Sequence, residues 1–233
     1  MGKRDKQNQI EFPGQDFEAA ASQLLRYADL ISRRGYVCNT LGNIAIRDLK
    51  NGVIYTKHKG VSLEEMTAEN IVVKDSNGKL LYGNKDTSVG NKLNCEIFKH
   101  RPDINAVIHL HPDDAIALFS VANLKEFPYL SIDAPPVLGK DPYILDPEVN
   151  VERDAGRIKG FIKNTNCFVM PNHGVTTLGR DISEAYHRMN TFMAEVKRLK
   201  GALVLSRALN ISVPYLPRNE VEALYRIADS LTR

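Results

Sequence analysis

Three histidines stand at positions from which they could bind a single metal ion. His109 and His111 are separated by one residue at the end of the apolar run 106–108, and His173 lies in a turn before Gly174. Residues i and i+2 of a strand point to the same face, so the first two imidazoles can turn toward one ion. Three neutral imidazoles leave a fourth coordination position open, as in catalytic zinc sites. The pattern predicts a divalent metal centre, with zinc as the expected ion.

The histidine pair alone is ambiguous. Two histidines that end a strand and hydrogen-bond to their neighbours would give the same spacing, and only the third histidine favours a metal site over this alternative. His173 follows a second apolar run, and the glycine after it lets the backbone approach a ligand closely. His58, His100 and His187 have no partner at such a spacing. We interpret these three as surface or helix-packing residues.

Composition indicates a globular protein and gives no sign of a nucleic-acid or membrane partner. Of the 233 residues, 43% are hydrophobic and 25% charged, which suffices for a sizeable core. We expect a single domain over 1–233, with residues 1–14 as a flexible tail. The net charge of +3 is not gathered into blocks, so neither nucleic acid nor a membrane surface is expected as a partner. No apolar segment follows the polar start, and the three cysteines form no C-x-x-C pair, which favours the cytoplasm.

The apolar periodicity predicts a mixed, largely antiparallel sheet between helices, because several of the strands form hairpins. Asp146 and Pro147 have the form of a helix start, as does Asp181 with Glu184 three residues later. The expected strands are 44–46, 53–55, 71–73, 79–82, 106–109, 167–170 and 175–178, and the expected helices are 17–34, 91–100, 147–162, 182 to beyond 199, and 221–231.

The run from Arg101 to His111, with the segment 172–175 downstream, resembles the class II aldolase/adducin family. The similarity extends upstream to 40–47, and order and spacing agree from about residue 18 to 205. The resemblance implies a three-layer α/β/α sandwich and a homotetramer with sites near subunit contacts. It also implies that His109, His111 and His173 hold zinc, which polarises a carbonyl and stabilises an enediolate during retro-aldol cleavage of a sugar phosphate.

The resemblance further implies a phosphate site made by three turns of the chain. Glycine-bearing turns present bare N–H groups to an anion, and nearby side chains can add hydrogen bonds or charge. Three ordinary turns are the alternative interpretation. The residues predicted to bind substrate or phosphate are Gly42, Asn43, Lys59, Gly60, Ser88 and Asn94.

One position departs from the family pattern. The aldolases of the family carry an acid/base glutamate at the start of a helix, and Gly90 occupies that position here. Glu96 lies further along the expected helix and points away from residue 90, so its carboxylate is a weak substitute. Asp133 is the other candidate, since dehydratase-like relatives supply a carboxylate from the corresponding segment. Asp113 and Asp114 are better explained as a helix N-cap.

The residues and the resemblance favour a metal-dependent carbon–carbon lyase of class II aldolase type. Its substrate would be a small phosphorylated or carboxylated carbonyl compound. A decarboxylase or a dehydratase on the same fold is an alternative enzyme. A non-catalytic, adducin-like oligomerisation or binding module is the alternative that the missing glutamate favours.

Overall fold

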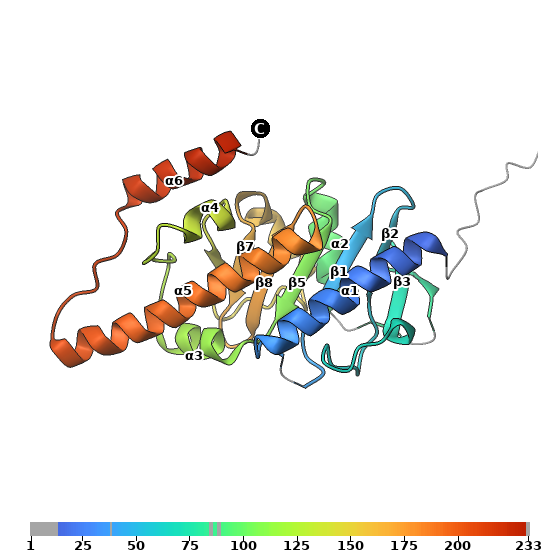
Figure 1. Ribbon diagram of the computed structural model, residues 1–233, viewed down its shortest axis with the longest axis horizontal. Helices are drawn as coiled ribbons and strands as arrows, with labels where there is room; N and C mark the ends of the chain where they lie inside the picture. The colour runs from blue at the N-terminus through green and yellow to red at the C-terminus, as the bar shows by residue number, and fades with distance from the viewer. Residues whose placement is uncertain (1–13, 38, 84–85, 88–89, 232–233) are drawn as a thin grey trace, which may run out of the picture.

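The computed structural model describes residues 14–37, 39–83, 86–87 and 90–231, and these form a layered α/β fold around one sheet (Figure 1). The described strands lie in the order β4-β3-β2-β1-β5-β8-β7-β6. All neighbouring strands are antiparallel except β6 and β7, which are parallel. The strands are β1 (Asn43–Asp48), β2 (Val53–Lys57), β3 (Ile71–Asp75), β4 (Leu80–Tyr82), β5 (Ala106–Leu110), β6 (Tyr143–Ile144), β7 (Cys167–Met170) and β8 (Gly174–Gly179).

Helices cover both faces of this sheet. In Figure 1, α1 and α5 lie across the front of the strands and α2 lies behind them. The 3-10 turns η2 and η3 pack beside α2, on its side of the sheet. The helical elements are α1 (Gln15–Arg33), η1 (Ala68–Asn70), α2 (Gly90–His100), α3 (Asp113–Val121), α4 (Ala134–Leu138), η2 (Ala155–Gly160), η3 (Ile162–Asn164), α5 (Ile182–Leu209) and α6 (Arg218–Leu231).

Successive residues of the central strands supply two separate cores. Ile44 and Ile108 pack in the cluster that contains side chains of α1 and α5, whereas Ala45 and Val107 pack in the cluster that contains side chains of α2. Both faces of the sheet are therefore buried, which explains why these strands read as continuous apolar runs. The three-layer sandwich with a mixed, largely antiparallel sheet is confirmed.

The helix expected over 147–162 is wrong. Asp146 Oδ1 accepts a hydrogen bond from the backbone N–H of Glu148, and Asn150 Oδ1 accepts from those of Glu152 and Arg153. Such side-chain bonds to the nearby backbone compete with helix formation. The segment instead forms turns that lead into the 3-10 turns η2 and η3.

Three smaller features also differ from expectation or lie outside it. Pro112 occupies the cap position of α3, and Asp113 and Asp114 lie in the first turn of that helix rather than capping it. Both α4 and β6 are too short to be seen in the apolar periodicity. The tail expected over 1–14 lies, except for residue 14, outside the described residues.

The second half of α5 runs past the edge of the sheet, and the chain then returns to α6 (Figure 1). Tyr225 of α6 donates a hydrogen bond to Asp141 Oδ1 at 2.8 Å, and Arg218 contacts Oδ2 of the same carboxylate at 2.6 Å.

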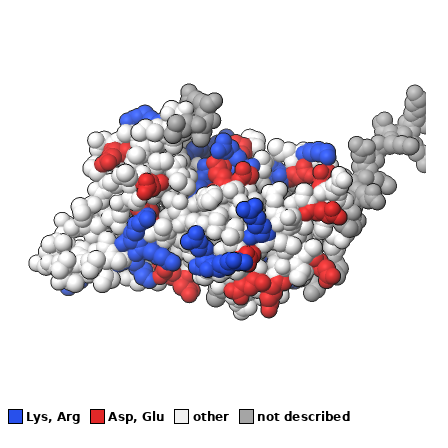
Figure 2. Space-filling model, in the orientation of Figure 1, with Lys and Arg blue, Asp and Glu red and all other residues white. Residues whose placement is uncertain are grey.

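Few charged side chains are visible on the projecting end of α5 (Figure 2). Its exposed apolar side chains are Val204, Leu205 and Leu209, followed by Ile211. None of the described helices is both long and apolar enough to cross a membrane.

Candidate metal centre

The sheet brings the three predicted histidines together. His109 is in β5 at the centre of the sheet, where its Cα pairs with Asn43 of β1 and Thr176 of β8. His111 follows the same strand, and His173 is in the tight turn between β7 and β8, which Asn172 makes with a left-handed backbone (φ 60°). The ligand nitrogens of the three imidazoles all lie within 4.8 Å of one another, and Nε2 of His109 is 3.0 Å from Nε2 of His111.

The state of the imidazoles suits a metal ligand set. His109 is buried, and its Nδ1 lies 2.9 Å from Oγ1 of Thr176, which leaves Nε2 facing the other histidines. Burial lowers the pKa of His109 to about 3 and that of His111 to about 4, so both rings are neutral at pH 7. Nε2 of His173 is also buried and lies with the nitrogens of His109 and His111 around one space. Three imidazole nitrogens arranged in this way fit a divalent transition metal.

A carboxylate that the sequence did not indicate lies beside these imidazoles. Oε2 of Glu152 is 3.2 Å from Nε2 of His173, and Oε1 is 3.6 Å from Nε2 of His109. Burial would raise the pKa of Glu152, but the contact of its carboxylate with Nε2 of His173 outweighs burial, and the pKa falls to about 2. The side chain is therefore an anion. This carboxylate was not predicted from the sequence because the segment was expected to form a helix. Asn150, which forms a turn just before Glu152, was the available signal.

The two carboxylates named from the sequence are placed elsewhere. Glu96 lies on α2 and pairs with Lys99 and His100, at 3.6 Å and 3.3 Å. Asp133 is exposed at the start of α4. Glu152 is therefore the carboxylate that the structure brings to the histidines.

The predicted anion-binding turns lie close to one another. Lys57, which the sequence did not single out, is buried and donates hydrogen bonds to the carbonyl oxygens of Thr40 and Val61, at 3.0 Å and 2.7 Å. It thereby joins the chain before Gly42 to the chain after Gly60. Burial lowers the pKa of Lys57 to about 8.

A second set of bonds extends this arrangement to α2. The backbone N–H of Lys59 donates to the carbonyl of Asp86 at 3.0 Å, two residues before Ser88 in the sequence. Asn94 is buried and donates to Oδ1 of Asn43 at 2.9 Å. The Lys59 side chain is exposed, and Ser88 lies outside the described residues. The described parts of the predicted cradle are thus held side by side.

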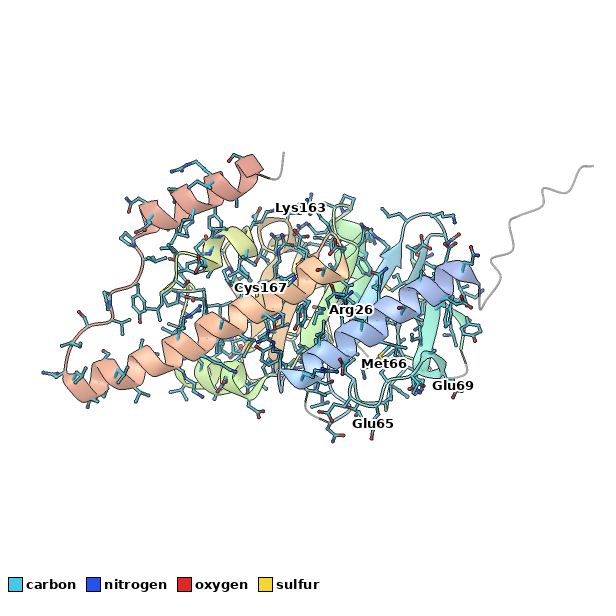
Figure 3. The ribbon with its side chains drawn as sticks, viewed as in Figure 1. Arg26, Glu65, Met66, Glu69, Lys163 and Cys167 are labelled. Carbon is cyan, nitrogen blue, oxygen red and sulfur yellow. The ribbon has the colours of Figure 1, made fainter. Side chains whose placement is uncertain are left out.

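The reduced cysteine in β7 has a packing role. Cys167, labelled in Figure 3, is fully buried in the core cluster that also contains α5 side chains, and burial raises the pKa of its thiol. A protonated, enclosed thiol is a poor nucleophile.

Comparison with known proteins agrees with the fold. A model of the class II aldolase and adducin N-terminal domain matches residues 22–197. An L-fuculose phosphate aldolase of Methanococcus maripaludis is 32% identical over 165 residues, which are 71% of this chain and 87% of the relative.

Solved structures share the fold at low sequence identity. YgbL from Escherichia coli, described as a candidate aldolase/epimerase/decarboxylase, superposes with a TM-score of 0.78 at 19% identity, covering 91% of this chain and 100% of its own. The L-fuculose-1-phosphate aldolase from Thermus thermophilus gives a TM-score of 0.69 at 22% identity, covering 82% and 96%. The resemblance drawn from the sequence is thereby confirmed, and this protein belongs to the class II aldolase and adducin N-terminal domain family.

Proposed function

We propose that the protein is a divalent-metal-dependent lyase that cleaves a carbon–carbon bond next to the carbonyl of a small sugar phosphate or a related compound. The observation that carries this proposal is the convergence of the ligand nitrogens of His109, His111 and His173 within 4.8 Å of one another. The family and the name of its aldolase relative support the reaction class. Zinc is the proposed ion.

The three histidines and the residues around them have defined tasks in such a reaction. The three imidazoles hold the metal, which when bound supplies a Lewis acid for the substrate carbonyl. Thr176 fixes the ring of His109 so that Nε2 faces inward. Backbone N–H groups of the turns at Gly42 and Gly60 would receive the substrate phosphate, and Lys57 keeps these two turns in place.

A decarboxylase is the second candidate, because the fold is shared with YgbL, which is described as a candidate aldolase/epimerase/decarboxylase. In both reactions a bond to the carbon next to a carbonyl breaks and its electron pair is delocalised into that carbonyl, while an aldehyde or carbon dioxide leaves, so the same metal centre would serve either. A non-catalytic, adducin-like module and a dehydratase remain as alternatives. A homotetramer in the cytoplasm is part of the proposal, and the exposed apolar end of α5 around Leu205 and Leu209 supports self-association.

Metal removal and a histidine variant test the proposal. The purified protein is expected to contain close to one divalent ion per chain. It should also form aldol adducts from dihydroxyacetone phosphate and a panel of aldehydes, and cleave such adducts. A chelator should abolish this activity and zinc should restore it. His173→Ala should lose the ion, whereas His187→Ala, an exposed histidine on α5, should retain it. A protein that takes up no divalent ion would overturn the proposal, and turnover of a 3-oxo acid with no aldol product would replace aldolase with decarboxylase.

A further inference from the structure

The side chain of Glu152 occupies the space beside the metal site that a side chain at position 90 would fill. Gly90 is the buried first residue of α2, and its backbone is not in the left-handed region. A Cβ at this position would lie 2.4 Å from Oε1 of Glu152 and 2.8 Å from Nδ2 of Asn43. Both neighbours are the ends of side chains, so a larger residue at position 90 would push the Glu152 carboxylate and the Asn43 amide aside. Glycine here leaves room for these groups, and its backbone conformation does not require it.

The carboxylate stands at the distance expected of a co-ligand. Two donor atoms that bind one zinc tetrahedrally, each about 2.0–2.1 Å from the ion, are about 3.3 Å apart. Oε2 of Glu152 is 3.2 Å from Nε2 of His173, and Oε1 is 3.6 Å from Nε2 of His109. The carboxylate is therefore close enough to these two nitrogens to meet the same ion.

The segment before η2 holds this carboxylate in place. Val151 is fully buried in the core cluster on the α2 side of the sheet. Asn150 Oδ1 accepts a hydrogen bond from the backbone N–H of Glu152 at 3.0 Å and from that of Arg153 at 3.2 Å. With a buried neighbour and a fixed turn, Glu152 is directed inward, whereas Glu148 of the same segment is exposed.

The surroundings of Glu152 also suit a metal ligand. Its side chain is only 17% exposed, and its ion-pair partners within the described residues are the imidazoles of His109 and His173. Carboxylates that are largely buried in proteins are paired or coordinate metals. A divalent ion held between the carboxylate and the imidazoles would give Glu152 such a partner.

We propose that Glu152 is the carboxylate of this metal centre, brought in by the segment between β6 and η2, and that Gly90 is the residue that makes room for it. This inference rests on the metal site of the proposed function. It gives the metal centre an acidic group, which α2 does not supply there because its first residue is Gly90.

Zinc affinity, measured by competition with a chromophoric chelator, tests this assignment. Glu152→Gln preserves the shape of the side chain and should weaken zinc binding about tenfold or more. Gly90→Ala should weaken it similarly by displacing the carboxylate. Glu148→Gln and Gly156→Ala are the matched controls, since Glu148 is exposed and a Cβ at Gly156 meets only an ordinary contact at 3.6 Å. Both controls should bind zinc as the wild type does.

A double variant separates this mechanism from general damage. Gly90→Ala should have little effect on zinc affinity when Glu152 has already been changed to alanine, because the displaced group is then absent. The cobalt-substituted wild type and Glu152→Gln should also differ in their visible absorption, which reports the ligands of the ion. Unchanged affinity and spectrum in Glu152→Gln, with a metal-loaded wild type, would overturn this inference and leave the proposed function standing. A wild type without affinity for metal would overturn both.

Discussion

Nδ1 of His109 lies 2.9 Å from Oγ1 of Thr176, and the two residues are also Cα partners across β5 and β8. The pairing of two strands thus orients a metal ligand. Thr176→Val keeps the volume of the side chain but removes this hydrogen bond, so we expect zinc affinity to fall by about tenfold. Chelator competition measures the change.

The neighbouring threonine provides the control for that experiment. Thr177 is equally buried, but it points to the other face of the sheet and donates its hydroxyl to the carbonyl of Ala185 at 2.9 Å. Thr177→Val should lower the free energy of unfolding by about 1 kcal/mol and leave zinc affinity unchanged. Equal zinc affinities in Thr176→Val and the wild type would contradict the orienting role.

Gly174 sets the closeness of β8 to β5 next to the metal site. A Cβ there would lie 2.3 Å from the carbonyl oxygen of Leu110 and 3.3 Å from Cε1 of His109. Gly174→Ala should therefore cost about 2 kcal/mol or more in urea unfolding and also weaken zinc binding. Gly201→Ala in α5, where nothing lies within 4 Å, should instead stabilise the protein by about 0.5–1 kcal/mol. If the free energy of unfolding changed with the same sign in both variants, close packing at Gly174 would not be the cause of its change.

Arg47 ties β1 to the chain that enters β5. Its guanidinium donates to the carbonyl oxygens of Phe98 at 2.7 Å and Pro102 at 2.9 Å, and to that of Ile104. Lysine cannot reproduce this fork, so Arg47→Lys should cost about 2–3 kcal/mol in urea unfolding. Arg33→Lys, which alters an exposed pair on α1, should stay within about 0.5 kcal/mol of the wild type. A small loss in both variants would refute the structural role of Arg47.

The buried amine of Lys57 should make the free energy of unfolding depend on pH in the alkaline range. Burial lowers the pKa of its amine from 10.5 to about 8 in the folded protein. Between these values the folded state has lost a proton that the unfolded chain keeps, so stability rises with pH; below pH 8 both states carry the proton and no slope results. We expect the wild type to gain about 2 kcal/mol relative to Lys57→Met between pH 8 and pH 10. Parallel curves for the two proteins would show that Lys57 titrates normally.

The sequence predicts well what repeats along the chain. Strand patterns around Ile44 and Ile108 follow from burial on both faces of the sheet, and the one-residue spacing of His109 and His111 follows from the strand period. The approach of His173 was a prediction from its turn that the family resemblance strengthened, because the pairing of β5 with β8 cannot be derived from local spacing. The convergence is observed, while zinc itself stays a prediction.

What the sequence did not predict depends on tertiary contacts. Hydrogen bonds of Asp146 and Asn150 to the nearby backbone outweigh the helical signals of their segment, and this placed Glu152 wrongly in a helix. Its approach to Gly90 joins distant parts of the chain through packing alone. In the sequence, glycine at position 90 means only that the glutamate of the family is missing. In the structure, this glycine leaves a space that the side chain of Glu152 occupies.

The claim on which the account depends is that His109, His111 and His173 bind one metal ion. X-ray absorption at the zinc edge of the zinc-loaded, desalted protein tests it most directly. The account predicts about one zinc per chain, with three imidazoles among its nitrogen and oxygen ligands at about 2.0–2.1 Å. Far less than one zinc per chain, or a shell with sulfur or without the imidazole pattern, would contradict it.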